Sequence, residues 1–153
     1  MCGGISMKIA IGSDHRGYNL KSELAKKMKE NGFSFEDYGC FSEERCDYPV
    51  FALKVAESVK NNECEYGVVI CGSGDGVSIA ANKVKGIRCV CLKDSEHVKR
   101  AREHVNINVL ALAAEETDVK TAYEMLNVFV NTKFLDGRYK ERLDLIDQYE
   151  KMK

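Results

Sequence analysis

The sequence lacks the features that mark membrane, secreted and nucleic-acid-binding proteins. No apolar run approaches the roughly 18 residues that a membrane span requires, and the N-terminal residues contain no apolar signal-peptide core. Positive charge is not in excess either, because 23 Lys and Arg residues face 24 Asp and Glu residues without a basic stripe. We therefore expect neither nucleic acid nor an anionic membrane as a partner.

Cysteine pairs at metal-binding spacing are also missing. The seven cysteines are an odd number and include no Cys-x-x-Cys motif, so we expect neither a disulfide framework nor a zinc site. A reducing, cytoplasmic location fits this pattern best.

Signs of long linkers are few, since Pro49 is the single proline and no repeat or low-complexity segment occurs among the 153 residues. That length suits one domain, which would bury roughly 68–70% of its unfolded surface. We expect a short flexible leader at residues 1–6 and a single domain over residues 7–150.

Strand-like and helix-like segments alternate along the chain. Apolar segments predict five strands, at Lys8–Gly12, Phe33–Tyr38, Val68–Ile70, Gly86–Leu92 and Asn108–Leu112. Helical spacing of apolar residues predicts helices over Leu20–Met28, Phe51–Val59, Val77–Val84, Ser95–His104, Thr117–Val130 and the residues after Gly137. This alternation predicts an α/β fold, a single-domain Rossmann-like three-layer sandwich with a five-stranded parallel sheet and an extra C-terminal helix.

The segment between the third strand and its helix is the most informative in the chain. After the strand come Cys71 and three glycines, in a segment that we call the glycine loop, residues 71–76. Glycines allow positive φ and bring backbone N–H groups close to a ligand, and a helix N-terminus adds further donors. The pattern predicts an anion site whose edge carries a thiol in a setting that favours the thiolate.

Two alternatives remain open from this local pattern alone. The glycines could form only a tight connection, and Cys71 could be an inert packing residue. The spacing matches neither a Walker A loop, since no Gly-Lys-Ser/Thr follows, nor a dinucleotide fingerprint.

In parallel α/β sheets the ligand binds beyond the carboxyl ends of the strands. We expect three polar clusters at that edge: Asp14 with His15, the glycine loop, and His104 near the start of the fifth strand. A lone histidine is more often structural than catalytic, but two that converge with an acid and a thiol favour a functional site.

Six motifs carry a resemblance that covers residues 7–146. They are Ile11-Gly12-Ser13-Asp14-His15-x-Gly17-x-x-Leu20-Lys21, Asp47-Tyr48-Pro49, Cys71-Gly72-Ser73-Gly74-x-Gly76-x-Ser78-Ile79-Ala80-Ala81-Asn82-Lys83, Lys85-Gly86-Ile87-Arg88, Arg102-Glu103-His104 with Asn108-Val109-Leu110, and Gly137-Arg138-x-x-x-Arg142. Together they resemble ribose-5-phosphate isomerase B, within the wider RpiB/LacA/LacB sugar-phosphate isomerase family.

The resemblance implies an isomerase that interconverts ribose 5-phosphate and ribulose 5-phosphate through a cis-enediolate, in the pentose phosphate pathway. It implies no metal or organic cofactor, and a homodimer, with a tetramer left open, whose active sites are shared between subunits. Such chemistry needs a base poised near neutral pH and donors aimed at the developing oxyanion.

The resemblance also implies roles for individual residues. Cys71 would be the base, Ser73 would assist proton movement between oxygens, and Asp14 with His104 would open the sugar ring. The predicted contacts to substrate or phosphate are His15, Tyr48, Gly72, Gly74, Asp75, Gly76, Arg138 and Arg142. The arginine pair alone would also fit an ordinary solvated helix face.

Three positions depart from the family pattern. Val105 replaces an Asn after the histidine, Glu115 stands where an Arg usually assists phosphate binding, and Asp75 replaces an apolar residue in the glycine loop. A carboxylate at position 115 would repel phosphate unless it turns away or another cation compensates it. Two alternatives follow: an isomerase of another aldose phosphate, such as allose or galactose 6-phosphate, or a non-catalytic sugar-phosphate binding protein.

Overall fold

The computed structural model describes residues 7–152, so the expected leader lies outside the described residues. A parallel sheet consists of β1 (Lys8–Ser13), β2 (Ser34–Asp37), β3 (Tyr66–Cys71), β4 (Cys89–Cys91) and β5 (Val109–Ala113), in the order β2-β1-β3-β5-β4. The helices are α1 (Tyr18–Glu30), α2 (Tyr48–Lys60), α3 (Asp75–Ala81), α4 (Ser95–Val105), α5 (Val119–Asn131) and α6 (Arg138–Lys151). The predicted α/β sandwich with a five-stranded parallel sheet is confirmed.

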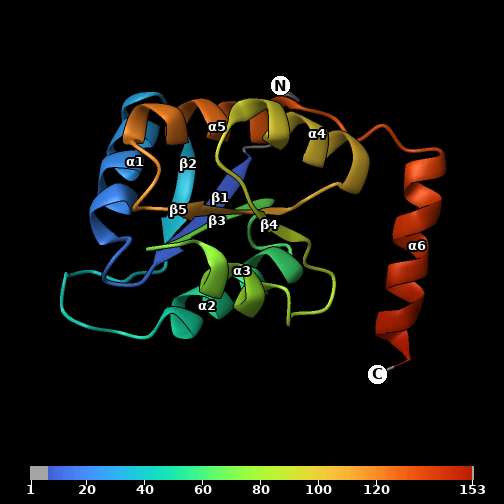
Figure 1. The fold of residues 1–153 in the computed structure, drawn as a ribbon, viewed down its shortest axis with the longest axis horizontal. Coiled ribbons are helices and arrows are strands. Elements are labelled where there is room, and N and C mark those ends of the chain that lie inside the picture. Colours follow the sequence, from blue (N-terminus) through green and yellow to red (C-terminus); the bar gives the residue numbers. More distant parts are fainter. Residues whose placement is uncertain (1–6, 153) are drawn as a thin grey trace.

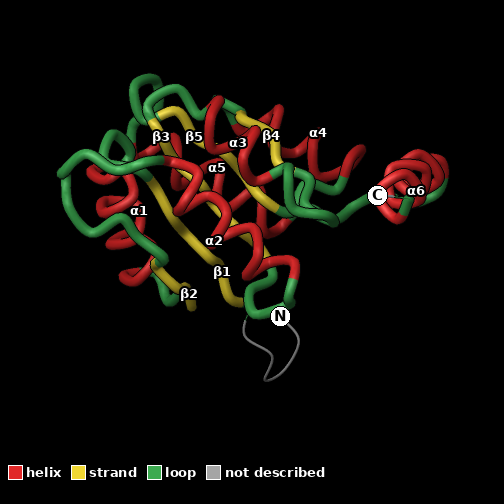
Figure 2. Tube along the Cα trace, turned by 90° about the horizontal axis from the view of Figure 1, so that it is seen from below, coloured by secondary structure: helices red, strands yellow, loops and turns green. Residues whose placement is uncertain are grey.

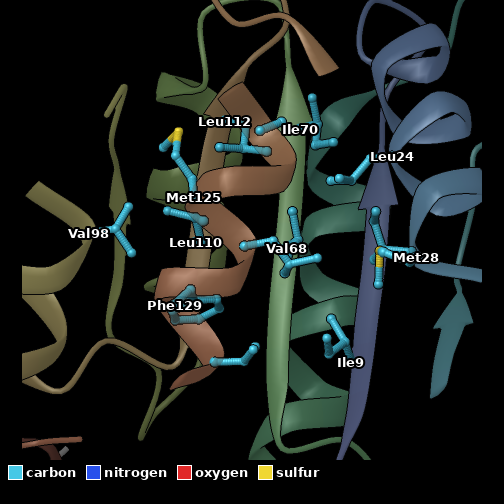
Figure 3. Packing of buried hydrophobic residues seen from close by; sticks show 14 of the residues in the cluster. Ile9, Leu24, Met28, Val68, Ile70, Val98, Leu110, Leu112, Met125 and Phe129 are labelled. Carbon is cyan, nitrogen blue, oxygen red and sulfur yellow. The ribbon is translucent and has the colours of Figure 1, made fainter. Parts of the chain in front are cut away.

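Helices cover both faces of the sheet: α1, α4 and α5 lie on one face, and α2 and α3 on the other (Figure 1). Side chains that alternate along each strand supply both layers. On the α1–α5 face, Ile9, Val68, Ile70 and Leu110 pack with helix residues in one buried cluster (Figure 3). The residues between them face α2 and α3, and Cys71 belongs to that second cluster.

Small residues let α2 approach the sheet closely. A Cβ built on Gly67 would lie 2.7 Å from Cγ1 of Val55, and one on Gly12 would lie 2.9 Å from its Cγ2. Both glycines are therefore needed for packing.

Three element boundaries follow from local residues. Pro49 lies in the first turn of α2, and Gly32, with φ +80°, follows α1. The Asp94 side chain caps α4 by accepting a hydrogen bond of 2.8 Å from the backbone N–H of His97.

Other predicted elements are shorter in the structure. The helix expected over Val77–Val84 ends at Ala81, because the Asn82 side chain instead bonds both the N–H and the C=O of Cys89. The strand expected from Gly86 begins only at Cys89, since Gly86 adopts a left-handed φ of +88°. β2 likewise omits the outer residues of the predicted strand Phe33–Tyr38.

Helix α6 projects from the body of the domain, as Figures 1 and 2 both show. Leu143 is its buried side chain, whereas Leu145, Ile146 and Tyr149 are more than half exposed. An apolar stripe is therefore left open to solvent on this helix. Within residues 7–152, no helix combines the length and the apolar character needed to cross a membrane.

Candidate functional site

The glycine loop holds the thiol of Cys71 at the carboxyl end of β3. Cys71 is 5% exposed, and its Sγ accepts a hydrogen bond of 3.2 Å from the backbone N–H of Gly74. Ser73 is exposed, and its Oγ accepts a 3.2 Å hydrogen bond from the Asp75 N–H. The loop backbone therefore contacts the sulfur that the resemblance implies to be the base.

At two positions of the loop only glycine fits, because neighbouring side chains occupy the space that a Cβ would need. Gly74 takes a left-handed φ of +79° as the N-cap of α3, and a Cβ there would collide with Sγ of Cys91. A Cβ on Gly76 would lie 2.7 Å from Cε1 and Cζ of the Tyr48 ring. The structure thus brings Tyr48, at the start of α2, against the loop.

Asp14 enters the same region from the end of β1. It is 6% exposed, and its Oδ1 accepts hydrogen bonds of 3.0 Å from the N–H groups of both Arg16 and Gly17. Its own N–H donates to the Ile70 carbonyl at 3.2 Å, next to Cys71. A Cβ on Gly17 would lie 2.7 Å from the Ile70 oxygen, so only glycine lets this turn pass the end of β3.

His15 and two further thiols border the site. The Nδ1 of His15 lies 3.2 Å from the Cys46 carbonyl oxygen, so the loop before α2 holds this ring nitrogen. Nε2 is then the ring nitrogen that can contact a ligand. Burial, followed by the neighbouring Cys40 thiol, raises the pKa of Cys46 to about 11. Burial and then the Asp75 carboxylate also raise the pKa of Cys91, so both thiols stay protonated near neutral pH.

The expected repulsion from Glu115 is compensated by a cation that sequence reasoning missed. The Glu115 carboxylate forms a salt bridge with the guanidinium of Arg16. Arg16 occupies the unspecified position of the motif Asp14-His15-x-Gly17, and its opposite charge to Glu115 was the available signal. Only the fold showed that the turns after β1 and β5 meet.

The structure separates His104 from these residues, so the expectation that one chain brings it to the carboxyl edge is wrong. In the register of β3 with β5, Gly67 pairs with Val109 and Cys71 with Ala113. His104 precedes Val109 and therefore lies beyond the amino end of β5, which is about 13 Å long at four residue steps. In a parallel sheet all strands run in the same direction, so a residue that precedes one strand lies at the opposite end of the strands from residues that follow a strand.

The two predicted phosphate arginines lie near His104 rather than near Cys71. The rings of His104 and Tyr139 stack with a centroid distance of 4.6 Å, and Nη2 of Arg138 donates to the Tyr139 hydroxyl at 3.3 Å. Arg142 follows one turn later on α6 and is exposed. Figure 1 shows α6 and the end of α4 at the opposite end of the strands from the loop between β3 and α3.

The predicted site therefore consists of two groups. The first half-site comprises Asp14, His15, Tyr48 and the glycine loop, and the second comprises His104, Arg138 and Arg142. Among residues 7–152, no group of three or more His, Cys, Asp or Glu side chains is arranged to hold a metal ion.

Comparison with known proteins adds independent information. Residues 9–146 match the ribose/galactose isomerase family. Ribose-5-phosphate isomerase B of Escherichia coli is 37% identical over 143 residues, which cover 94% of this chain and 96% of that protein.

Solved structures agree with this match. Ribose-5-phosphate isomerase B of Clostridium thermocellum has a TM-score of 0.92 and 45% identity, over 95% of this chain and 99% of that one. The Mycoplasma genitalium enzyme, solved with bound ribulose 5-phosphate, has a TM-score of 0.91 and 36% identity, over 97% and 99%.

Proposed function

The chain belongs to the ribose/galactose isomerase family, and we propose that its two half-sites combine into a sugar-phosphate isomerase site. The protein is an isomerase that interconverts ribose 5-phosphate and ribulose 5-phosphate, a step of the pentose phosphate pathway. The observation that supports the site most strongly is the Cys71 sulfur, held by a backbone N–H within the glycine loop.

In the proposed reaction, the Cys71 thiolate removes the proton from C2 of the open-chain aldose. The electron pair moves into a C1–C2 double bond, and O1 becomes the oxyanion of a cis-enediolate. Backbone N–H groups of the glycine loop stabilise that charge. Ser73 assists transfer of the proton from O2 to O1, and the Cys71 thiol then returns its proton to C1.

The remaining residues bind and prepare the substrate. Asp14, fixed by two N–H donors, acts with His104 in opening the furanose ring. His15 binds the phosphate from the first half-site, and Arg138 and Arg142 bind it from the second. Tyr48, whose ring packs against Gly76, contacts the substrate from the start of α2.

This division of labour requires two chains, since one chain holds its half-sites at opposite edges of the sheet. We propose a homodimer in which the second half-site of each subunit covers the first half-site of its partner. The exposed apolar side chains of α6 support this, because a stripe of that kind is normally buried in an interface. A tetramer built from two such dimers would use the same contacts.

The proposed domain spans residues 7–150 and acts in the cytoplasm. The cysteines of the described part, from Cys40 to Cys91, are all free thiols, which fits a reducing compartment. Six-carbon aldose phosphates are a second candidate substrate class. This is favoured by Val105, which is 41% exposed beside His104 where the family has an amide.

Turnover of ribose 5-phosphate by wild-type protein and by Cys71→Ala tests the proposal. We expect robust turnover by the wild type and loss of at least about a thousandfold in the variant, with ribose 5-phosphate still bound. Cys64→Ala, which truncates another buried thiol, is the matched control and should remain active. Normal turnover by Cys71→Ala would remove Cys71 as the base.

A further inference from the structure

Arg16 lies at the first half-site but has no role in the reaction described above. Its backbone N–H donates to Asp14 at 3.0 Å, directly before the turn into α1. Its side chain reaches over the first glycine of the loop: a Cβ built on Gly72 would lie 3.0 Å from both Cζ and Nε of Arg16. The positive charge of Arg16 therefore lies next to Gly72, the residue that follows Cys71.

Glu115 holds this charge in place from the other side. Its backbone N–H donates to the Gly72 carbonyl at 3.1 Å, and the Ala114 N–H donates to the Cys71 carbonyl at 2.9 Å. The turn after β5 is thus fixed to the glycine loop. The Glu115 carboxylate, which pairs with Arg16, would lie 2.7 Å from the same built Cβ on Gly72.

Stability does not account for this ion pair. The side chains of Arg16 and Glu115 are 59% and 50% exposed, and pairs so open to solvent contribute little to folding. A guanidinium also carries more N–H donors than one carboxylate can engage, so the paired Arg16 keeps donors for a second anion. A carboxylate that fixes an arginine beside an anion loop reduces the entropy lost when a ligand binds.

We propose that Arg16 is a ligand of the substrate's phosphate group and that Glu115 is its positioning residue. The inference rests on the proposed function, because it takes a phosphorylated aldose as the substrate. Arg16 supplies from the turn after β1 the cation that position 115 does not supply. Its guanidinium binds the phosphate dianion on the same side as His15, while the second half-site binds it from the partner subunit.

The test compares Arg16→Ala with Arg100→Ala, which removes the same charge from an exposed site on α4. We expect KM for ribose 5-phosphate and Ki for inorganic phosphate to rise about 10- to 100-fold in Arg16→Ala, with kcat changed less than about threefold. Turnover of unphosphorylated D-ribose should be unchanged, because no phosphate is present to lose a ligand. Arg16→Lys should recover part of the affinity.

The double variant R16E/E115R keeps the ion pair with its charges exchanged. It should restore the Ki for inorganic phosphate to within about threefold of the wild type, whereas Arg16→Glu alone should bind phosphate worst. Equal Ki values for Arg16→Ala and Arg100→Ala would overturn the proposal. So would a loss of D-ribose turnover equal to that with ribose 5-phosphate, since that would indicate a structural role.

Failure of the proposed function would look different. A wild-type protein that turns over no ribose 5-phosphate contradicts the isomerase, but binding of inorganic phosphate, measured by calorimetry, still compares Arg16→Ala with wild type. Weaker phosphate binding by the variant would support the anion role of Arg16 even then, and equal binding would refute it.

Discussion

In the proposed homodimer, two inactive variants should complement each other when their subunits are exchanged. Cys71→Ala destroys the first half-site of its own chain, and the double variant Arg138→Ala/Arg142→Ala destroys the second. In a mixed dimer, one active site combines both defects, and the other combines an intact loop with intact arginines. Complementation is expected because the fold keeps the two half-sites of one chain apart by about the length of β5, roughly 13 Å.

The size of the recovery follows from the geometry of a twofold dimer. Equal amounts of the two variants, fully exchanged, give about half mixed dimers, each with one intact site of two, so about one quarter of wild-type activity returns. Each variant alone should stay near background. The fraction should rise from background as exchange proceeds.

The assay is turnover of ribose 5-phosphate after the mixed variants are partly denatured in urea and refolded together. Each variant refolded alone is the control for recovery, and native mass spectrometry reports the share of mixed dimers. Background activity in a sample that contains about half mixed dimers would refute the shared site. Recovery well above one quarter would also contradict the arithmetic, since only one intact site per mixed dimer is available.

Two further predictions concern the glycine loop and pH. Gly74→Ala and Gly86→Ala both place a side chain at positive φ, which costs about 1–2 kcal/mol, but a Cβ at Gly86 meets nothing within 4 Å, whereas one at Gly74 meets Cys91. For Gly86→Ala, calorimetry should show a Tm about 2–8 °C lower and kinetics a normal kcat. For Gly74→Ala, the fall in Tm should be larger and kcat should drop at least tenfold. An active Gly74→Ala enzyme would contradict the role of the loop. Burial raises the pKa of Cys89 from 9.0 to about 12. Between these pH values the folded chain keeps a proton that the unfolded chain releases. The stability that this group contributes is therefore fully present below pH 9 and is lost as the pH rises toward 12. Urea unfolding at pH 8 and pH 10 should show that Cys89→Ala loses about 1.4 kcal/mol less than wild type over this interval, and equal losses would exclude Cys89 as the titrating group.

The elements around the loop were predictable because their signals are local. A β-branched run, a glycine turn and helical spacing are each encoded within about ten residues, and the alternation of strands and helices restricts the sheet to parallel connections. For the same reason the helix expected over Ser95–His104 is close to the observed helix, Ser95–Val105. Element ends were less predictable. The helix expected to include Val84 stops at Ala81, since Asn82 makes long-range bonds to Cys89.

Partner choice across the sheet could not be predicted from local signals. The pairing of Arg16 with Glu115 joins two turns that are 99 positions apart in the numbering. It forms because β1 and β5 are both neighbours of β3 in the sheet, so the turns that follow them meet over the end of β3. No periodicity in the sequence reports that strand order. The same holds for Tyr48 against Gly76, whose contact depends on how closely α2 approaches the loop.

The sequence by itself determined the α/β class, the identity of the glycine loop and the set of residue types that suit proton transfer between carbons. These properties depend on short-range pattern and on side-chain chemistry. Only the tertiary structure decided where the parts lie: Arg16 beside Glu115, and His104 with Tyr139 and Arg138 at the opposite edge from Cys71. The physical reason is that the direction and order of parallel strands set which ends of distant segments meet, and no residue encodes that alone.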